Sequence, residues 1–226
     1  MKICIIPARA GSKRIEKKNI IPFFDKPIIS YAIKVALDSN LFDEVMVSTE
    51  DQEIAEISKS FGAKVPFLRS IENASDFAST TDVLLEVIEM YEALGLKFDS
   101  ICCLYPTSVL INSELINLGF EKFISNKADS LFTVQEYKHP IQRALRLKNQ
   151  KLNWVNKEFE FSRTQDLETS YFDCGQFYML KTSEFLIQKS LLMNNTIGFL
   201  LAQNEAQDID NYEDLDILKL KFRSYK

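Results

Sequence analysis

The chain has 226 residues, of which 46% are hydrophobic and 26% are charged, as in ordinary soluble globular proteins. Its net charge of −5 at pH 7 argues against a nucleic-acid binder, which needs many Lys and Arg residues spread over one face. No apolar run approaches the roughly 20 residues that span a bilayer, so we expect neither a membrane protein nor a membrane partner.

Short apolar segments alternate with helical patterns along the first half of the chain. We predict strands at 2–6, 45–47, 64–68 and 101–104. The helical patterns between them cover 27–37, 54–61 and a stretch that begins with a cap at Ser79, Thr80 or Thr81 and reaches Tyr91. This alternation predicts an α/β fold with a doubly wound, mainly parallel sheet, in which ligands bind beyond the carboxyl ends of the strands.

The pattern changes after about residue 130. A strand at 131–134 precedes two short runs, 144–147 and 152–155, which predict a β-hairpin. The remaining elements are a strand at 177–180, a helix near 182–192, a strand near 197–202 and a helix at about 211–223. We expect a single domain over residues 1–226, in which about 130–172 form an inserted β-hairpin arm that makes the contact of a homodimer.

The cysteines indicate a reducing compartment. Cys4, Cys102, Cys103 and Cys174 include no C-x-x-C pair, and we interpret them as buried small hydrophobic residues. Met1 also leads directly into the first strand, without the longer leader of a secretion signal. We therefore expect a cytoplasmic protein.

A cationic loop follows the first strand directly. Its basic residues are Arg9, Lys13, Arg14, Lys17, Lys18 and, slightly later, Lys26. On an acidic protein, such a loop at the end of a strand predicts a polyanion such as a triphosphate, and a charged surface loop is the alternative. Neither G-x-x-x-x-G-K-[ST] nor G-x-G-x-x-G is present, so side-chain cations, helped by backbone N–H groups around Gly11, must neutralise the phosphates.

Two carboxylates late in the chain are candidate metal ligands. Asp208 and Asp210 are two residues apart, so an extended backbone turns both side chains to the same side. Such a pair can hold a Mg²⁺ ion that keeps several waters and contacts phosphate oxygens. Capping of the last helix is the alternative role, and Asn211 could take that role instead.

Several segments taken together indicate a family. They are, in chain order, 6–20, Val47–Glu50, Leu68–Arg69, Ala74–Asp76, Leu104–Ser108 and Asp208–Asp210. Read end to end, these segments closely resemble the signature of the acylneuraminate cytidylyltransferases, the CMP-sialic acid synthetase family. The chain departs from that signature at Ala10, Glu16 and Tyr105, where the family usually has Gly, Pro and Gln.

One stretch indicates a branch of this family. Arg163–Glu168, together with Asp173–Tyr178, is similar to the pseudaminic acid cytidylyltransferases, and Tyr105 also fits that branch. The resemblance implies a nucleotide-diphospho-sugar transferase-like, Rossmann-like fold. It also implies a reaction in which CTP and an acidic nine-carbon 2-keto sugar give a CMP-sugar and pyrophosphate, with Mg²⁺ as the cofactor.

The resemblance further implies roles for the residues that match the motifs. The expected catalytic residues are Arg9, Lys18, Asp208 and Asp210, and the two aspartates are also the expected Mg²⁺ ligands. Lys13 joins Arg9 and Lys18 at the triphosphate, while Arg14 and Lys17 are auxiliary. Asn19 and Arg69 are candidates for ribose and cytosine contacts, with Ser75 and Asp76 nearby. The other expected substrate-binding residues are Ala8, Ser12, Tyr105, Thr107, Ser108, His139, Gln165, Gln176 and Tyr178.

Several of these residues have a simpler role as the alternative to substrate binding. Arg69 could be a surface arginine, Thr107 and Ser108 could serve the turn after Pro106, and His139 could be structural or exposed. N-acetylneuraminic, legionaminic or another 2-keto sugar acid is the alternative substrate. A non-catalytic nucleotide-sugar-binding protein on the same fold is the alternative function.

Overall fold

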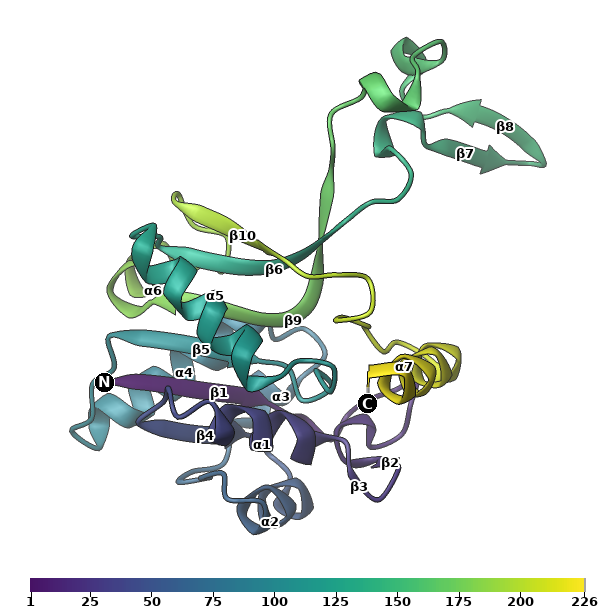
Figure 1. Ribbon diagram of the computed structural model, residues 1–226. Coiled ribbons are helices and arrows are strands. Elements are labelled where there is room, and N and C mark those ends of the chain that lie inside the picture. Colours follow the sequence, from purple (N-terminus) through teal and green to yellow (C-terminus); the bar gives the residue numbers. More distant parts are fainter. Residues whose placement is uncertain (226) are drawn as a thin grey trace.

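Six strands form the central sheet of the computed structural model, which describes residues 1–225, in the order β10-β6-β9-β5-β1-β4 (Figure 1). β1 pairs in parallel with β4 and β5, and β6 pairs in parallel with β10, whereas β9 is antiparallel to both of its neighbours. The strands are β1 (Lys2–Pro7), β4 (Glu44–Ser48), β5 (Ser100–Leu104), β6 (Ser130–Glu136), β9 (Tyr171–Lys181) and β10 (Thr196–Leu200). The prediction of a mainly parallel α/β sheet is therefore confirmed.

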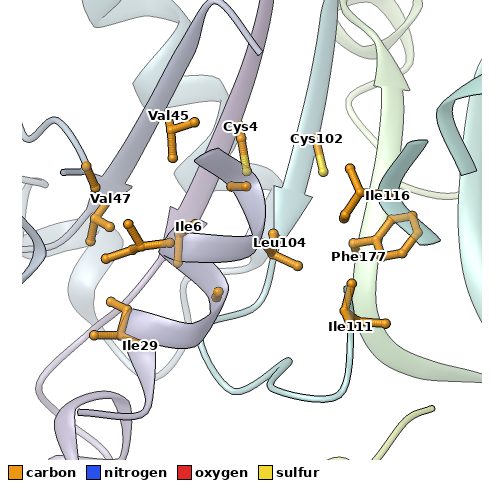
Figure 2. Close-up of a cluster of buried hydrophobic side chains, with 14 of the residues drawn as sticks. Cys4, Ile6, Ile29, Val45, Val47, Cys102, Leu104, Ile111, Ile116 and Phe177 are labelled. Carbon is orange, nitrogen blue, oxygen red and sulfur yellow. The ribbon is translucent and has the colours of Figure 1, made fainter. Parts of the chain in front are cut away.

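Helices cover both faces of this sheet. α1 (Ile29–Asp38), α2 (Gln52–Ser60) and α5 (Ser113–Ser125) supply buried side chains to the core on one face. There Cys4 and Ile6 of β1 lie between Val47 of β4 and Leu104 of β5 (Figure 2). α4 (Thr80–Ala93) and α6 (Thr182–Gln188) close the core on the other face. No helix among the described residues has an apolar stretch long enough to cross a membrane.

The sequence analysis differs from the structure in three details. The strand expected at 64–68 is reduced to an isolated bridge between Met46 and Lys64, since Pro66 lacks the N–H that would continue the ladder. The helix expected at 182–192 ends at Gln188, because Lys189 adopts the left-handed conformation (φ 45°). The sequence reading omitted α5, which begins after an N-cap at Asn112.

A third hydrophobic cluster joins the two ends of the chain. α7 (Tyr212–Tyr225) buries Leu215 and Leu218, and the segment before it buries Ile209. These side chains pack with Ile15 of the cationic loop and with residues of the small β2 (Pro22–Phe23)–β3 (Lys26–Pro27) ribbon region. Burial of this apolar surface holds the segment around Asp208 against the loop that follows β1.

Residues between β6 and β9 project away from the body of the molecule (Figure 1). They carry the hairpin of β7 (Leu145–Lys148) and β8 (Lys151–Trp154), with short 3₁₀ turns at Ile141–Arg143, Lys157–Phe159 and Thr164–Asp166. Asn149 and Gln150 make the hairpin turn, and both have positive φ, as a two-residue turn that follows the strand twist requires. We call residues 137–170 the arm.

Candidate active site

A cavity of about 510 Å³ opens where β1 and β5 end. This is the edge of a parallel sheet at which ligands bind, since the loops after neighbouring strands diverge there. The cavity is lined by side chains that the sequence analysis singled out, namely Arg9, Ser12, Lys13, Lys18, Asn19, Arg69, Ser75, Asp76, Tyr105, Thr107, Asp208 and Asp210. Segments from both ends of the chain therefore meet at one place.

Direct contacts join the cationic loop to the acidic segment. Lys18 donates a hydrogen bond from Nζ to the carbonyl oxygen of Ile209 at 2.7 Å. Arg14 donates from a guanidinium nitrogen to Oδ1 of Asp210 at 2.6 Å. Arg14 therefore lines the cavity with the principal cations, whereas Lys17 pairs with Glu53 outside the lining.

The other two cations of the loop face the segment before α4. Arg9 donates from Nη1 to Oδ1 of Asp76 at 2.8 Å and to the carbonyl oxygen of Ser75 at 3.1 Å. Lys13 pairs with the second oxygen of the same carboxylate. These two cations hold the pKa of Asp76 below its usual range, with the hydrogen bond from Lys13 as the largest cause.

Polar side chains fix the backbone of the cationic loop. Glu50, just after β4, accepts a hydrogen bond from the backbone N–H of Ala10 at 2.8 Å. Asn19 is 5% exposed and donates from its amide to the carbonyl oxygen of Arg9 at 2.8 Å. Asn19 thus lines the cavity and at the same time holds the loop in shape.

Asp208 and Asp210 form an acidic corner of the cavity. Water reaches the side chain of Asp208, but protein atoms crowd its carboxylate, and this desolvation, together with the charge of Asp210, raises its pKa. Helix capping does not use these two carboxylates, because Asn211 accepts the hydrogen bond from the N–H of Asp214. Both carboxylates therefore remain at the cavity, where Asp210 pairs with Arg14.

Arg69 is a buried guanidinium in the wall of the cavity. It is 7% exposed, and burial lowers its pKa. It donates from Nε to Oγ of Ser48 at 3.0 Å and from Nη2 to the carbonyl oxygen of the same residue. Among the described residues, these bonds leave Nη1 for a ligand in the cavity.

Tyr105 forms the wall of the cavity after β5. The hydroxyl of Tyr105 shares a 2.9 Å hydrogen bond with Oγ1 of Thr80, and burial raises the pKa of Tyr105 to about 12. Its ring packs edge-on against Tyr178, whose hydroxyl donates to Asp173 at 2.8 Å. Tyr105 therefore stays neutral near pH 7 and presents a fixed ring beside Thr107.

Four of the expected substrate contacts lie in the protein interior instead of in the cavity lining. Ala8 is fully buried, and Ser108 donates to the backbone carbonyl of Gln176 at 2.9 Å. Gln176 and Tyr178 are each 2% exposed, because β9 lies inside the sheet and is covered on both faces. Although side chains alternate between the two faces of β9, neither face is therefore open to a ligand in the cavity.

Glycine and aspartate in the same stretch shape a β-bulge. The register between β6 and β9 shifts near Gly175, which has φ of 60°, a conformation that favours glycine. Asp173 accepts the N–H of Gly175 at 2.9 Å, which closes the turn. His139 and Gln165, the last two expected contacts, are exposed on the arm.

Residues 73–83 also supply lining that the sequence analysis did not assign to the site. Asn73, Ala78, Ser79, Thr80 and Val83 all face the cavity. Ser79 and Asp82 form a capping box at the start of α4, and the Ser-x-x-Asp pattern was the available signal. Such a pattern predicts the start of a helix, but it carries no information on the direction of the helix in the fold.

The fold and the cavity are those of an α/β nucleotide-binding protein, and comparisons with known proteins give its family. The sequence profile of the cytidylyltransferase family matches residues 3–219. The chain belongs to the cytidylyltransferase family.

Individual relatives cover almost the whole chain. A pseudaminic acid cytidylyltransferase of Campylobacter jejuni subsp. jejuni serotype O:2 is 40% identical over 98% of this chain and 96% of its own length. An N-acylneuraminate cytidylyltransferase of Streptococcus agalactiae serotype III is 30% identical over 94% of this chain and 51% of its own length. The solved structure of a CMP:2-keto-3-deoxy-manno-octonic acid synthetase complexed with CTP has the same fold, with a TM-score of 0.74, 18% identity and coverage of 100% of this chain and 99% of that one.

Proposed function

We propose that this protein transfers the CMP group of CTP to pseudaminic acid, an acidic nine-carbon 2-keto sugar, and releases pyrophosphate. The observation that carries the proposal is the meeting of the cationic loop and the Asp208–Asp210 segment in one cavity, through Lys18 and Arg14. The choice of sugar is supported by the 40% identity to the Campylobacter jejuni relative over nearly the full length of both chains.

The proposed reaction depends on positioning and on charge neutralisation. The anomeric hydroxyl of the sugar attacks the α-phosphorus and loses its proton as a new P–O bond forms. The bond between the α-phosphorus and the oxygen that bridges to the β-phosphate breaks, and pyrophosphate leaves. Arg9, Lys13 and Lys18 hold the triphosphate and the leaving pyrophosphate, whose negative charge they offset. Arg69 contacts the nucleoside through its remaining guanidinium nitrogen.

The acidic pair fits a divalent cation. Within residues 1–225, no group of three or more His, Cys, Asp or Glu side chains is arranged to hold a metal. A site of two carboxylates leaves the remaining coordination positions to water and phosphate oxygens, which is how proteins usually bind Mg²⁺. Asp208 and Asp210 would hold the ion, and when bound it supplies positive charge beside the phosphates.

The proposal includes a homodimer, and the exposed apolar side chains of the arm support it. Its hairpin presents Leu145, Leu147 and Leu152 to solvent, and Phe161 farther along is 92% exposed. Exposed apolar side chains gathered on a projecting hairpin suit burial against another protein surface. We assign that surface to a second copy of this chain. We also place the protein in the cytoplasm, because its four cysteines are all free thiols.

The test is pyrophosphate release with a panel of substrates. CTP, UTP, ATP and GTP are each combined with pseudaminic, legionaminic and N-acetylneuraminic acid in the presence of Mg²⁺. We expect the highest kcat/KM for CTP with pseudaminic acid. A higher value with another sugar acid would overturn the choice of sugar, and tight binding of a CMP-sugar without any pyrophosphate release would favour the non-catalytic alternative.

A further inference from the structure

Asp76 occupies two of the cations that the proposed function assigns to the triphosphate. Its carboxylate accepts from Arg9 at 2.8 Å and pairs with Lys13 through its other oxygen. The carbonyl oxygen of Ser75 accepts from the same nitrogen of Arg9. Three oxygens from one short segment therefore surround the two cations, in the way that phosphate oxygens would.

Lys18 differs from these two cations. Its Nζ donates to the neutral carbonyl oxygen of Ile209, and within residues 1–225 no carboxylate contacts it directly. Of the three cations assigned to the triphosphate, Lys18 therefore has no directly bound carboxylate among the described residues, whereas Arg9 and Lys13 share one. Phosphate oxygens can replace the carboxylate at Arg9 and Lys13 only after the ion pairs of Asp76 with these two cations have broken.

The segment that carries Asp76 is also anchored at both of its ends, by contacts that do not involve the cationic loop. On one side, Glu86 accepts from the N–H of Ser70 at 2.7 Å and from the amide of Asn73 at 2.6 Å. On the other side, the capping box of Ser79 fixes the start of α4. Between these anchors lies Phe77, whose side chain is 97% exposed.

We propose that Asp76 is an exchangeable counter-ion, which holds residues 75–78 against the cationic loop until the triphosphate displaces it from Arg9 and Lys13. This inference rests on the proposed function, because it takes the triphosphate as the displacing anion. The exchange is feasible because the ion pairs of Asp76 are exposed to solvent, and exposed pairs contribute little stability. Several phosphate charges then replace a single carboxylate charge.

The first test measures polyanion affinity by isothermal titration calorimetry. Inorganic tripolyphosphate and CTP are titrated into the wild type, into Asp76→Asn and into Asp38→Asn. Asp38 lies at the end of α1, pairs with Lys34 and is outside the cavity lining, so its variant controls for the loss of one negative charge. Asp76 and Asp38 are both on the surface, so we expect both variants to fold as the wild type does.

We expect Asp76→Asn to lower the Kd for tripolyphosphate by about 3- to 10-fold, since each exposed ion pair contributes at most about a fivefold factor. CTP changes in the same direction, and Asp38→Asn leaves both values unchanged. If the wild type binds CTP but Asp76→Asn binds it equally or more weakly, the exchange is wrong and the proposed function still holds. If the wild type binds neither ligand, both are wrong.

The second test follows the segment itself. Trp154, the single tryptophan of the chain, lies on the arm, so Trp154→Phe gives a silent background in which Phe77→Trp reports on residues 75–78. Tripolyphosphate is expected to change the fluorescence of this reporter. Adding Asp76→Asn to this background should reduce the fluorescence change caused by tripolyphosphate at least about twofold, because residues 75–78 are already released from Arg9 and Lys13. Equal amplitudes with and without Asp76 would overturn the proposal.

Discussion

Arg69 shows how a single residue depends on its surroundings for its role. From the sequence it could equally be a surface arginine at the end of a strand, but the structure buries it to 7% exposure. Two of its guanidinium nitrogens bind Ser48, so the planar group is held in one orientation. A buried cation with a fixed direction at a cavity wall suits recognition of a nucleotide better than a mobile surface charge does.

Replacement of Arg69 by lysine tests this role. We expect Arg69→Lys to raise the KM for CTP about tenfold, with a smaller effect on kcat, because an ammonium cannot keep both Ser48 bonds and also reach the ligand. Steady-state kinetics on pyrophosphate release measure both constants. Arg163→Lys, an exposed position on the arm, is the matched control and should change neither. An unchanged KM in Arg69→Lys would contradict the assigned contact.

Charged residues of the site were the most predictable from sequence. Arg9, Lys13 and Lys18 stand out because cations are dense after one strand of an acidic chain, and Asp208 and Asp210 stand out by their spacing. The neutral lining residues that the family resemblance did not single out gave no comparable signal. Asn73, for example, faces the cavity only because Glu86 of α4 holds it there, and that contact is tertiary.

At the scale of elements, the least predictable feature was the place of β9 in the sheet. The family resemblance suggested Gln176 and Tyr178 as ligand contacts, and Phe177 and Met179 alternate with them along the strand. Because β9 lies between β5 and β6 and is covered on both sides, all four side chains are buried. A sequence pattern of period two gives the two faces of a strand, but it does not tell whether either face meets solvent.

The contact between α5 and β9 provides a test of this packing. Gly119 lies in the middle of α5, where a Cβ atom would come within 2.9 Å of the ring of Phe177. Glycine to alanine in a helix usually stabilises by about 1 kcal/mol, but overpacking of a core costs about 1–3 kcal/mol. We therefore expect Gly119→Ala to lower the free energy of unfolding by up to about 2 kcal/mol in urea titrations.

The double variant supplies the control for that experiment. Phe177→Leu removes the ring that the new methyl group would strike, so Gly119→Ala should be better tolerated in that background. Purely additive effects of the two substitutions would show that the close contact is not the cause.

At the scale of the whole molecule, the arm is the part whose role the central sheet and its helices do not explain. It projects from the sheet (Figure 1). It carries His139 and Gln165, two of the expected sugar contacts, and neither lines the cavity of its own chain. Its hairpin was predictable, because two β-like runs flank a polar turn. Its direction was not, because that depends on how β6 and β9 leave the sheet.

Charge introduced on the hairpin tests the proposed homodimer. Leu147 and Leu152 face each other across β7 and β8 and are 68% and 63% exposed. We expect Leu147→Asp combined with Leu152→Asp to give a monomer by size-exclusion chromatography with light scattering, with little change in Tm. Leu94→Asp, at an equally exposed site after α4, should leave the dimer intact. A double variant that remains dimeric would place the interface elsewhere.

The central claim is that the cationic loop and the late aspartate pair act on one nucleotide tail, and Mg²⁺-dependent pyrophosphate release tests it most directly. Asp210→Asn is compared with Asp216→Asn, an exposed aspartate of α7 that pairs only with Lys219 among the described residues. We predict that kcat falls at least about 100-fold in Asp210→Asn, since a metal ligand is lost beside the phosphates, and is unchanged in Asp216→Asn. Turnover at the wild-type rate in Asp210→Asn would contradict the account.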